Sequence, residues 1–164
     1  ALTSLNSLIF ENQQLASDFL QQLSKVYRYV LQNKDKETVP LSTELNFIAH
    51  YISLLKIRFS TAIDFQINLN EEVKEKEIVP VTLQILIENA VKHNIVSMAA
   101  PLKILITSNA EYLIVENTIN KKVQVEASNR QGLDNLKGFY QYLSTMPIEI
   151  SETKNLFTVK IPLI

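Results

Sequence analysis

The chain has 164 residues, enough for one well-packed domain or for a domain with an appendage. Its formal charge of −1 at pH 7 lacks the basic footprint of nucleic-acid binding, so we expect no nucleic-acid partner. There is no cysteine, which excludes disulfides and thiolate metal sites, and no apolar run is long enough to cross a membrane, so no direct membrane contact is expected.

Apolar residues three or four positions apart predict a helical segment over residues 1–35. The stripe consists of Leu15, Phe19, Leu23, Val26 and Val30. Asn12 is a good N-cap residue and marks a place where this segment can break. A wide apolar stripe ahead of a compact domain indicates either a partner helix in a dimer bundle or packing on the domain's own core. Both alternatives stay open at this point.

A charged linker over residues 33–37 is followed by Val39-Pro40, and we place a domain boundary there. Residues 1–38 then form a helical region, and residues 39–164 form the compact domain. Because the chain begins at Ala1 in the middle of a helical pattern, we expect it to be part of a longer protein.

The compact domain is predicted to begin with a helix over residues 42–58. Ser42 is the expected N-cap, and Glu44 in the first turn favours the helix dipole. Alternating apolar and polar residues over 63–69 predict a half-buried strand. A polar connection over residues 71–77 leads from this strand to the next helix.

The stretch from Val79 to Asn94 organises the rest of the chain. Pro80 suits the first turn of a helix, where its missing N–H costs nothing. The helix has one apolar face, made of Leu83, Leu86, Ile87, Ala90 and Val91. Its other side carries polar residues three or four apart, which are neighbours on a helix: Glu88, Asn89, Lys92 and His93.

These four polar residues bring a carboxylate, an amide oxygen, an ammonium and an imidazole to one patch. Hard oxygen ligands suit Mg²⁺, which combines one or two protein ligands with phosphate oxygens and water. Lysine binds phosphate as a point charge. The patch therefore predicts a metal–nucleotide site, and the alternative is a solvated helix face with an ordinary Glu–Lys pair.

Two hairpins and one helix complete the chain. The strands are predicted over 102–107 with 112–117, and over 148–152 with 157–163. The polar residues 118–131 form a loop, and a short helix follows Gly132. The order of elements predicts an α+β fold, a two-layer α/β sandwich with a mixed sheet and helices on one face, preceded by the N-terminal helical segment.

The run Glu88-Asn89-Ala90-Val91-Lys92-His93 resembles the N box of the GHKL ATPases, in the form found in LytS-type sensor histidine kinases. Residues 39–59 resemble the family pattern "VPLxxELxFxxxYxxLxKxRF". Residues 23–31, "LSKVYRYVL", resemble the segment that follows the phosphoacceptor histidine in these kinases. The resemblance extends over nearly the whole chain and implies the GHKL fold.

The same resemblance implies ATP and Mg²⁺ as ligands and a role for each site residue. Asn89 would coordinate Mg²⁺, and Glu88 would orient or activate the reacting group as the catalytic residue. Asn117 would contact the adenine. Four residues would face the phosphates: Lys92, His93, Arg130 and, through its amide, Gly132.

Two motifs depart from the family pattern. The family's "DxGxG" is replaced by Glu116-Asn117-Thr118, where Asn117 takes the adenine position and Glu116 is the competing alignment. An Asn oxygen accepts from an amino group, although Asn is also a common turn former at strand ends. In the family's "GxGLxN", Arg130 replaces the first glycine, which leaves Gly132 to offer backbone N–H groups at a helix start.

The resemblance implies the catalytic fragment of a two-component sensor histidine kinase. Such a fragment would phosphorylate a histidine upstream of residue 1, for relay to a response regulator, and would form a homodimer through its N-terminal helices. Full-length members are anchored in the membrane, so the fragment would be the cytoplasmic domain. The alternative is a degenerate kinase domain that dimerises and signals without ATP turnover, which the scarcity of glycine favours and the intact N box opposes.

Overall fold

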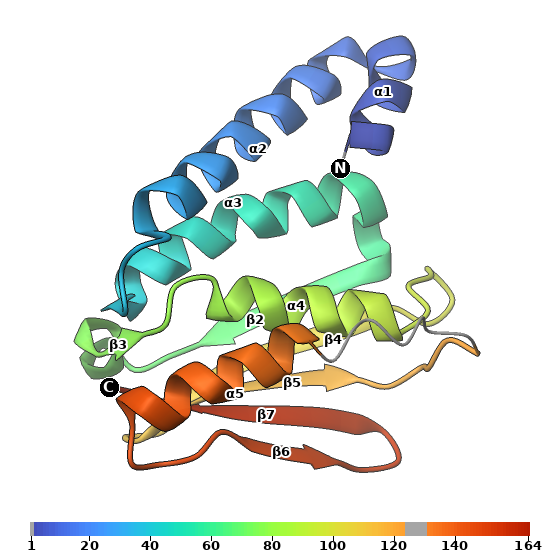
Figure 1. Cartoon of the computed structure of the whole chain (residues 1–164). Helices are drawn as coiled ribbons and strands as arrows, with labels where there is room; N and C mark the ends of the chain where they lie inside the picture. Colours follow the sequence, from blue (N-terminus) through green and yellow to red (C-terminus); the bar gives the residue numbers. More distant parts are fainter. Residues whose placement is uncertain (1, 124–130) are drawn as a thin grey trace.

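The computed structural model describes residues 2–123 and 131–164. Two helices come first, α1 (Leu2–Glu11) and α2 (Gln13–Asn33), and the chain bends between them so that α1 lies beside the start of α2 (Figure 1). The side-chain oxygen of Asn12 accepts a hydrogen bond from the Leu15 amide at 3.0 Å. The predicted break at Asn12 is therefore confirmed, and its cause is a capped helix start.

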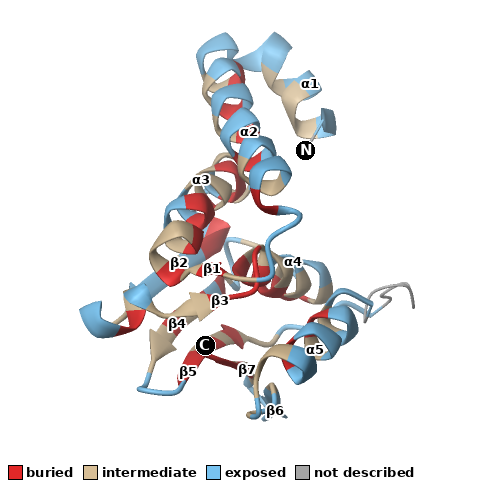
Figure 2. Cartoon of the chain, turned by 60° about the vertical axis from the view of Figure 1, so that its left-hand side comes forward, coloured by how far each residue is buried: buried red, intermediate tan, exposed pale blue. Residues whose placement is uncertain are grey.

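The apolar stripe of α2 packs on the helix that opens the compact domain, α3 (Leu41–Phe59). Phe19, Leu23 and Val26 are buried in the same core cluster as the apolar residues of α3. The core thus continues across the connection at residues 34–38, where the domain boundary is predicted. Figure 2 shows this inner side of α2 buried and its outer side exposed.

The main sheet contains five strands in the order β2-β4-β5-β7-β6 within the described part of the chain. These strands are β2 (Ile63–Asn68), β4 (Leu102–Ser108), β5 (Tyr112–Thr118), β6 (Glu149–Glu152) and β7 (Leu156–Pro162). The pairing of β2 with β4 is parallel and the other pairings are antiparallel, so the sheet is mixed. Both predicted hairpins are therefore confirmed.

Two short strands, β1 (Val39–Pro40) and β3 (Glu77–Ile78), form a separate antiparallel pair. Short 3-10 turns, η1 (Ser60–Ala62) and η2 (Glu71–Glu75), flank β2 on either side. Pairing with β3 keeps the chain extended through Pro40, which is consequently the residue before α3 and provides no side-chain cap. The prediction of Ser42 as the N-cap is therefore wrong.

Helices α4 (Thr82–His93) and α5 (Gln131–Leu143) lie across one face of the sheet, with α3 beyond α4 (Figure 1). Alternate residues of the central strands face these helices and are buried, as in Leu102, Ile104 and Ile106 of β4. The fold is the predicted α+β two-layer sandwich. No helix in the residues that the structure describes has the length and apolar character needed to cross a membrane.

The start of α4 differs from the prediction. The helix begins at Thr82, so Pro80 lies before the first turn rather than within it. Val81 separates the two with a left-handed backbone, φ 61° and ψ 11°, which is unusual for a β-branched residue. The hydroxyl of Tyr140 on α5 accepts a hydrogen bond from the Val79 amide at 3.0 Å, which helps to hold this turn.

Candidate functional site

The polar side of α4 is divided between two cavities. Asn89 and His93 line a cavity of about 450 Å³ whose other walls come from α5 and the sheet. Glu88 and Lys92 line a second cavity of about 690 Å³, between α4 and the helices α2 and α3. Successive helix residues are about 100° apart, so these two pairs point to different sides. The structure thus brings together two of the four N-box side chains in each cavity.

Glu88 accepts hydrogen bonds from neighbouring side chains in the second cavity. Its Oε1 accepts a hydrogen bond from the Tyr51 hydroxyl at 3.2 Å and from the Gln84 amide at 2.9 Å. Burial, followed by the nearby charge of Glu88, raises the pKa of Tyr51 well above its ordinary value. The carboxylate therefore faces α3 and not the side of α4 where Asn89 lies.

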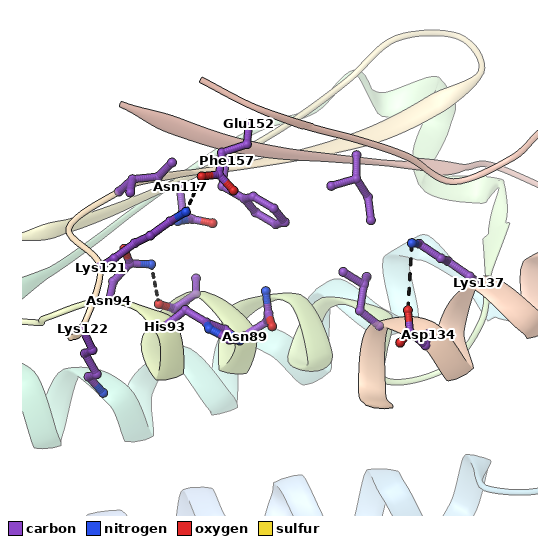
Figure 3. A pocket seen from close by; sticks show the side chains of 14 residues that line it. Asn89, His93, Asn94, Asn117, Lys121, Lys122, Asp134, Lys137, Glu152 and Phe157 are labelled. Carbon is purple, nitrogen blue, oxygen red and sulfur yellow. Dashed lines mark hydrogen bonds and ion pairs between the residues drawn. The ribbon is translucent and has the colours of Figure 1, made fainter. Parts of the chain in front are cut away.

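The first cavity collects polar groups from several elements (Figure 3). Asn117 comes from β5, Lys121 and Lys122 follow it, and Asp134 and Lys137 come from α5. The apolar part of the lining consists of Ala90, Ile119, Leu133, Ile150 and Phe157. Glu152 of β6 also lines the cavity, so the two carboxylates of Asp134 and Glu152 are matched by the ammonium groups of Lys121 and Lys137.

Asn117 is buried at the end of β5, with 6% of its surface exposed. Its amide nitrogen donates to the Thr118 carbonyl at 2.8 Å, which fixes the orientation of the side chain. Phe157 is its partner in the β5–β7 register, so an amide and an aromatic ring stand next to each other on the cavity wall. This pair suits a flat heteroaromatic ring that carries an amino group.

Glu116, the competing alignment for that contact, points away from the cavity. Neighbouring residues of a strand face opposite sides of a sheet, and Glu116 precedes Asn117 on β5. Its carboxylate accepts a hydrogen bond from the Thr158 hydroxyl at 3.2 Å. Of the two alternatives, the geometry favours Asn117.

The lysines that line the cavity already have local partners. Lys121 forms an ion pair with Glu152, and Lys137 lies 4.0 Å from Asp134. Both pairs are largely exposed, and exposed pairs contribute little to stability. A phosphate group can therefore compete for these ammonium groups. Lys122 points away from the cavity in Figure 3, with its Nζ 3.4 Å from the Val91 carbonyl oxygen.

Asn94, which is not among the predicted site residues, fastens the segment after β5 to the end of α4. Its side chain is buried, donates to the Ala90 carbonyl at 2.9 Å and accepts from the Asn120 amide at 2.7 Å. The Lys122 amide also donates to the His93 carbonyl at 3.1 Å. An Asn at the end of a helix is a common terminating residue and can be recognised in the sequence. Its contact with Asn120, 26 positions away, cannot.

Arg130 and Gly132 are the two remaining predicted phosphate contacts. Arg130 lies outside the described residues. Gly132 is the second residue of α5 and is exposed. A Cβ atom at Gly132 would lie 3.5 Å from Ile85 Cγ2, an ordinary contact, and the backbone has no positive φ. Neither packing nor backbone geometry therefore requires a glycine at this position.

The described residues contain no group of three or more His, Asp or Glu side chains arranged to hold a metal ion by themselves. Mg²⁺ bound with a nucleotide takes most of its ligands from phosphate and water and needs one or two protein oxygens. The Asn89 amide oxygen is one such donor on the cavity wall. The residues present therefore fit a cation that arrives with a polyphosphate, and they do not form a protein-only metal cage.

Comparison with known proteins agrees with this fold. The cytoplasmic segment of histidine kinase QseC superposes with a TM-score of 0.53 at 20% identity, covering 77% of this chain and 76% of that one. The catalytic domain of histidine kinase ThkA gives a TM-score of 0.50 at 18% identity, covering 76% of this chain and 97% of that one. The fold is that of the histidine kinase catalytic domains, the GHKL fold.

The family model described as histidine kinase matches residues 1–63. Sensor protein kinase HptS of Staphylococcus aureus (strain bovine RF122 / ET3-1) is 32% identical over 99% of this chain and 35% of its own length. HptS of strain USA300 is 34% identical over 82% of this chain and 26% of its own length. The chain belongs to the sensor histidine kinase family, and it spans about a third or less of the length of these relatives.

Proposed function

We propose that this chain binds ATP and Mg²⁺ and is the catalytic part of a two-component sensor histidine kinase. It would transfer the γ-phosphoryl group of ATP to a histidine outside residues 1–164, for relay to a response regulator. One observation supports this proposal above the others: Asn89, His93 and Asn117, which lie on two separate elements, line the same cavity.

Each predicted residue has a role in this proposal. Asn89 holds Mg²⁺ through its amide oxygen, and Asn117 accepts a hydrogen bond from the adenine amino group beside Phe157. His93 faces the phosphates, together with Lys121. Gly132, near the start of α5, is proposed as a further phosphate contact, because a backbone without a side chain allows close approach. Arg130, outside the described residues, is proposed as another.

Glu88 and Lys92 act on the other side of α4. In this proposal the histidine comes from the side of α4 that both residues line, and it meets the γ-phosphoryl group where the two cavities adjoin at Lys122, which lines both. Glu88 orients or activates that histidine, and Lys92 meets the phosphoryl group as it is transferred. Bound Mg²⁺ neutralises charge on the phosphates, and the protein contributes mainly position and electrostatic stabilisation.

Isothermal titration calorimetry of the chain with ATP tests this function, once with Mg²⁺ and once with EDTA. We expect saturable binding in the presence of Mg²⁺ and much weaker binding without it, because Asn89 would hold the cation that accompanies the phosphates. Absence of heat at millimolar ATP with Mg²⁺ would support the alternative, a degenerate domain that signals without turning over nucleotide. The scarcity of glycine, with Gly132 and Gly138 alone in the chain, favours that alternative.

We further propose a homodimer formed through the N-terminal helices, within a longer protein that is anchored in the membrane and keeps these residues in the cytoplasm. Leu20, Tyr27 and Leu31 lie on one side of α2 and are 52%, 60% and 66% exposed. Sedimentation velocity should show a dimer, and the double variant Leu20→Ser/Leu31→Ser should be monomeric. The matched variant Gln21→Ser/Gln32→Ser, on another side of α2, should remain dimeric; a monomeric wild-type chain would contradict the proposal.

A further inference from the structure

A buried carboxylate connects three helices near the start of α4. Glu44, in the first turn of α3, is fully buried, with 0% of its surface exposed. Its Oε2 accepts hydrogen bonds from the Tyr29 hydroxyl of α2 at 2.5 Å and from the Val81 amide at 3.2 Å. Its Oε1 accepts one from the Leu83 amide at 3.1 Å. A buried carboxylate is costly unless it is hydrogen-bonded, so these three donors are held in fixed positions relative to α3.

The start of α4 depends on this carboxylate because it has no cap of its own. The N-cap residue, Val81, has an apolar side chain and makes no capping hydrogen bond. The first amides of a helix have no partner within that helix, and a negative charge is favourable beside them. Glu44 therefore caps α4 from a neighbouring helix. Its bond to the Val81 amide also helps to enforce the left-handed backbone there, which persists only where the surroundings impose it.

Tyr29 connects helix α2 to the Glu44 carboxylate. The Tyr29 ring stacks on Phe47 of α3 with a centroid distance of 4.0 Å and an interplanar angle of 10°, which directs the hydroxyl toward Glu44. A rotation or shift of α2 would move this hydroxyl off the carboxylate. Glu44 would then stay buried with one donor fewer, which is unfavourable. The position of α2 and the capping of α4 are thus energetically linked.

We propose that Glu44 is a positioning residue that sets the start of α4 and makes it depend on α2. Asn89 lies about 12 Å along the helix from Val81, given a rise of 1.5 Å per residue. Because a helix moves as a rigid element, a change at Val81 is passed on to the Asn89 and His93 side chains in the cavity. The effect on the cavity rests on the proposed function, since it takes the ligand to be a nucleotide; the link between α2 and α4 does not.

The variant Tyr29→Phe tests the link with minimal disturbance, because it removes one hydroxyl and keeps the stacked ring. Amide hydrogen exchange, measured by NMR, should become about tenfold faster at Val81 and Leu83, because the carboxylate that caps them is held by one donor fewer. Core amides of β4 and β5, such as Ile106 and Val115, should keep their rates. The matched control is Tyr142→Phe, since Tyr142 is an exposed tyrosine on α5 and its variant should leave all rates unchanged.

A second variant, Glu44→Gln, keeps the size of the side chain and one carbonyl acceptor, and it should give the same local pattern. Unchanged exchange at Val81 and Leu83 in both variants would overturn the proposal, and so would an equal acceleration at Ile106 and Val115, which would indicate global destabilisation.

Calorimetry should show weaker ATP·Mg²⁺ binding by Tyr29→Phe, and unchanged affinity would overturn the coupling to the cavity. If the wild-type chain binds no ATP, the proposed function fails, while the exchange rates still decide the role of Glu44.

Discussion

Replacing Asn89 by alanine is expected to abolish Mg²⁺-dependent ATP binding. The amide oxygen of Asn89 is the hard donor that α4 offers to a cation in the first cavity, and an alanine offers none. The loss should exceed the roughly 10- to 100-fold that even outer-shell partners of a metal contribute to affinity. Calorimetric titration with ATP, in the presence of Mg²⁺ and then of EDTA, measures this difference directly.

The fold should tolerate Asn89→Ala, because Asn89 is half-buried on α4 and alanine has the higher helix propensity. Thermal unfolding followed by circular dichroism should therefore give an unchanged or slightly higher Tm. Asn68→Ala serves as the matched control, since Asn68 is exposed on β2 at one edge of the sheet. Undiminished Mg²⁺-dependent affinity in Asn89→Ala would remove this residue from the site and leave the fold assignment intact.

The second large effect is a loss of stability as pH rises from about 4.5 toward about 7, and it should depend on Glu44. Burial raises the pKa of Glu44 from its ordinary 4.5 to about 7, although hydrogen bonds from Tyr29, Leu83 and Val81 oppose the rise. A raised pKa means that the folded state binds the proton more tightly than the unfolded state. The stabilisation is therefore complete below about pH 4.5 and is lost as pH rises through about 7, an effect on the order of 3 kcal/mol.

Urea unfolding between about pH 5 and pH 8 measures this effect as the difference between the wild type and Glu44→Gln, which cannot titrate. The groups that face Glu44 from neighbouring helices are Tyr29 and Tyr140. Burial raises the pKa of both hydroxyls, that of Tyr140 to about 12, so neither titrates in this range. The exposed control Glu72→Gln should follow the wild type. Parallel curves for the wild type and Glu44→Gln would show that Glu44 does not titrate in this range.

The sequence predicts the fold well because its elements carry strong local patterns. The helix predicted over 42–58 is α3, and the alternation over 102–107 and 112–117 gives the hairpin of β4 and β5. Periodicity also identifies the buried residues of α4. It does not show where a helix face is divided between two cavities, which is why the sequence predicts a single patch for Glu88 and Asn89, although they lie about 100° apart on the helix.

The features of the site that cannot be predicted from the sequence depend on contacts between residues that are distant along the chain. Glu44 caps a helix whose first amides are 37 and 39 positions away, and a carboxylate in a first helical turn predicts only a dipole interaction. The preference for Asn117 over Glu116 follows from the strand register, since the two side chains lie on opposite faces. Motif alignment left that choice open.

The hydrogen bonds that fasten the segment after β5 to the end of α4 also limit where the length of the chain can vary. Residues 119–122 are hydrogen-bonded through the backbone to residues 93–95 and to Asn155, so an insertion there would break these hydrogen bonds. Closing a longer loop costs little additional entropy once its ends are fixed. Relatives with longer or shorter connections between β5 and α5 are therefore expected to differ after position 122, and an inserted label or tag belongs there as well.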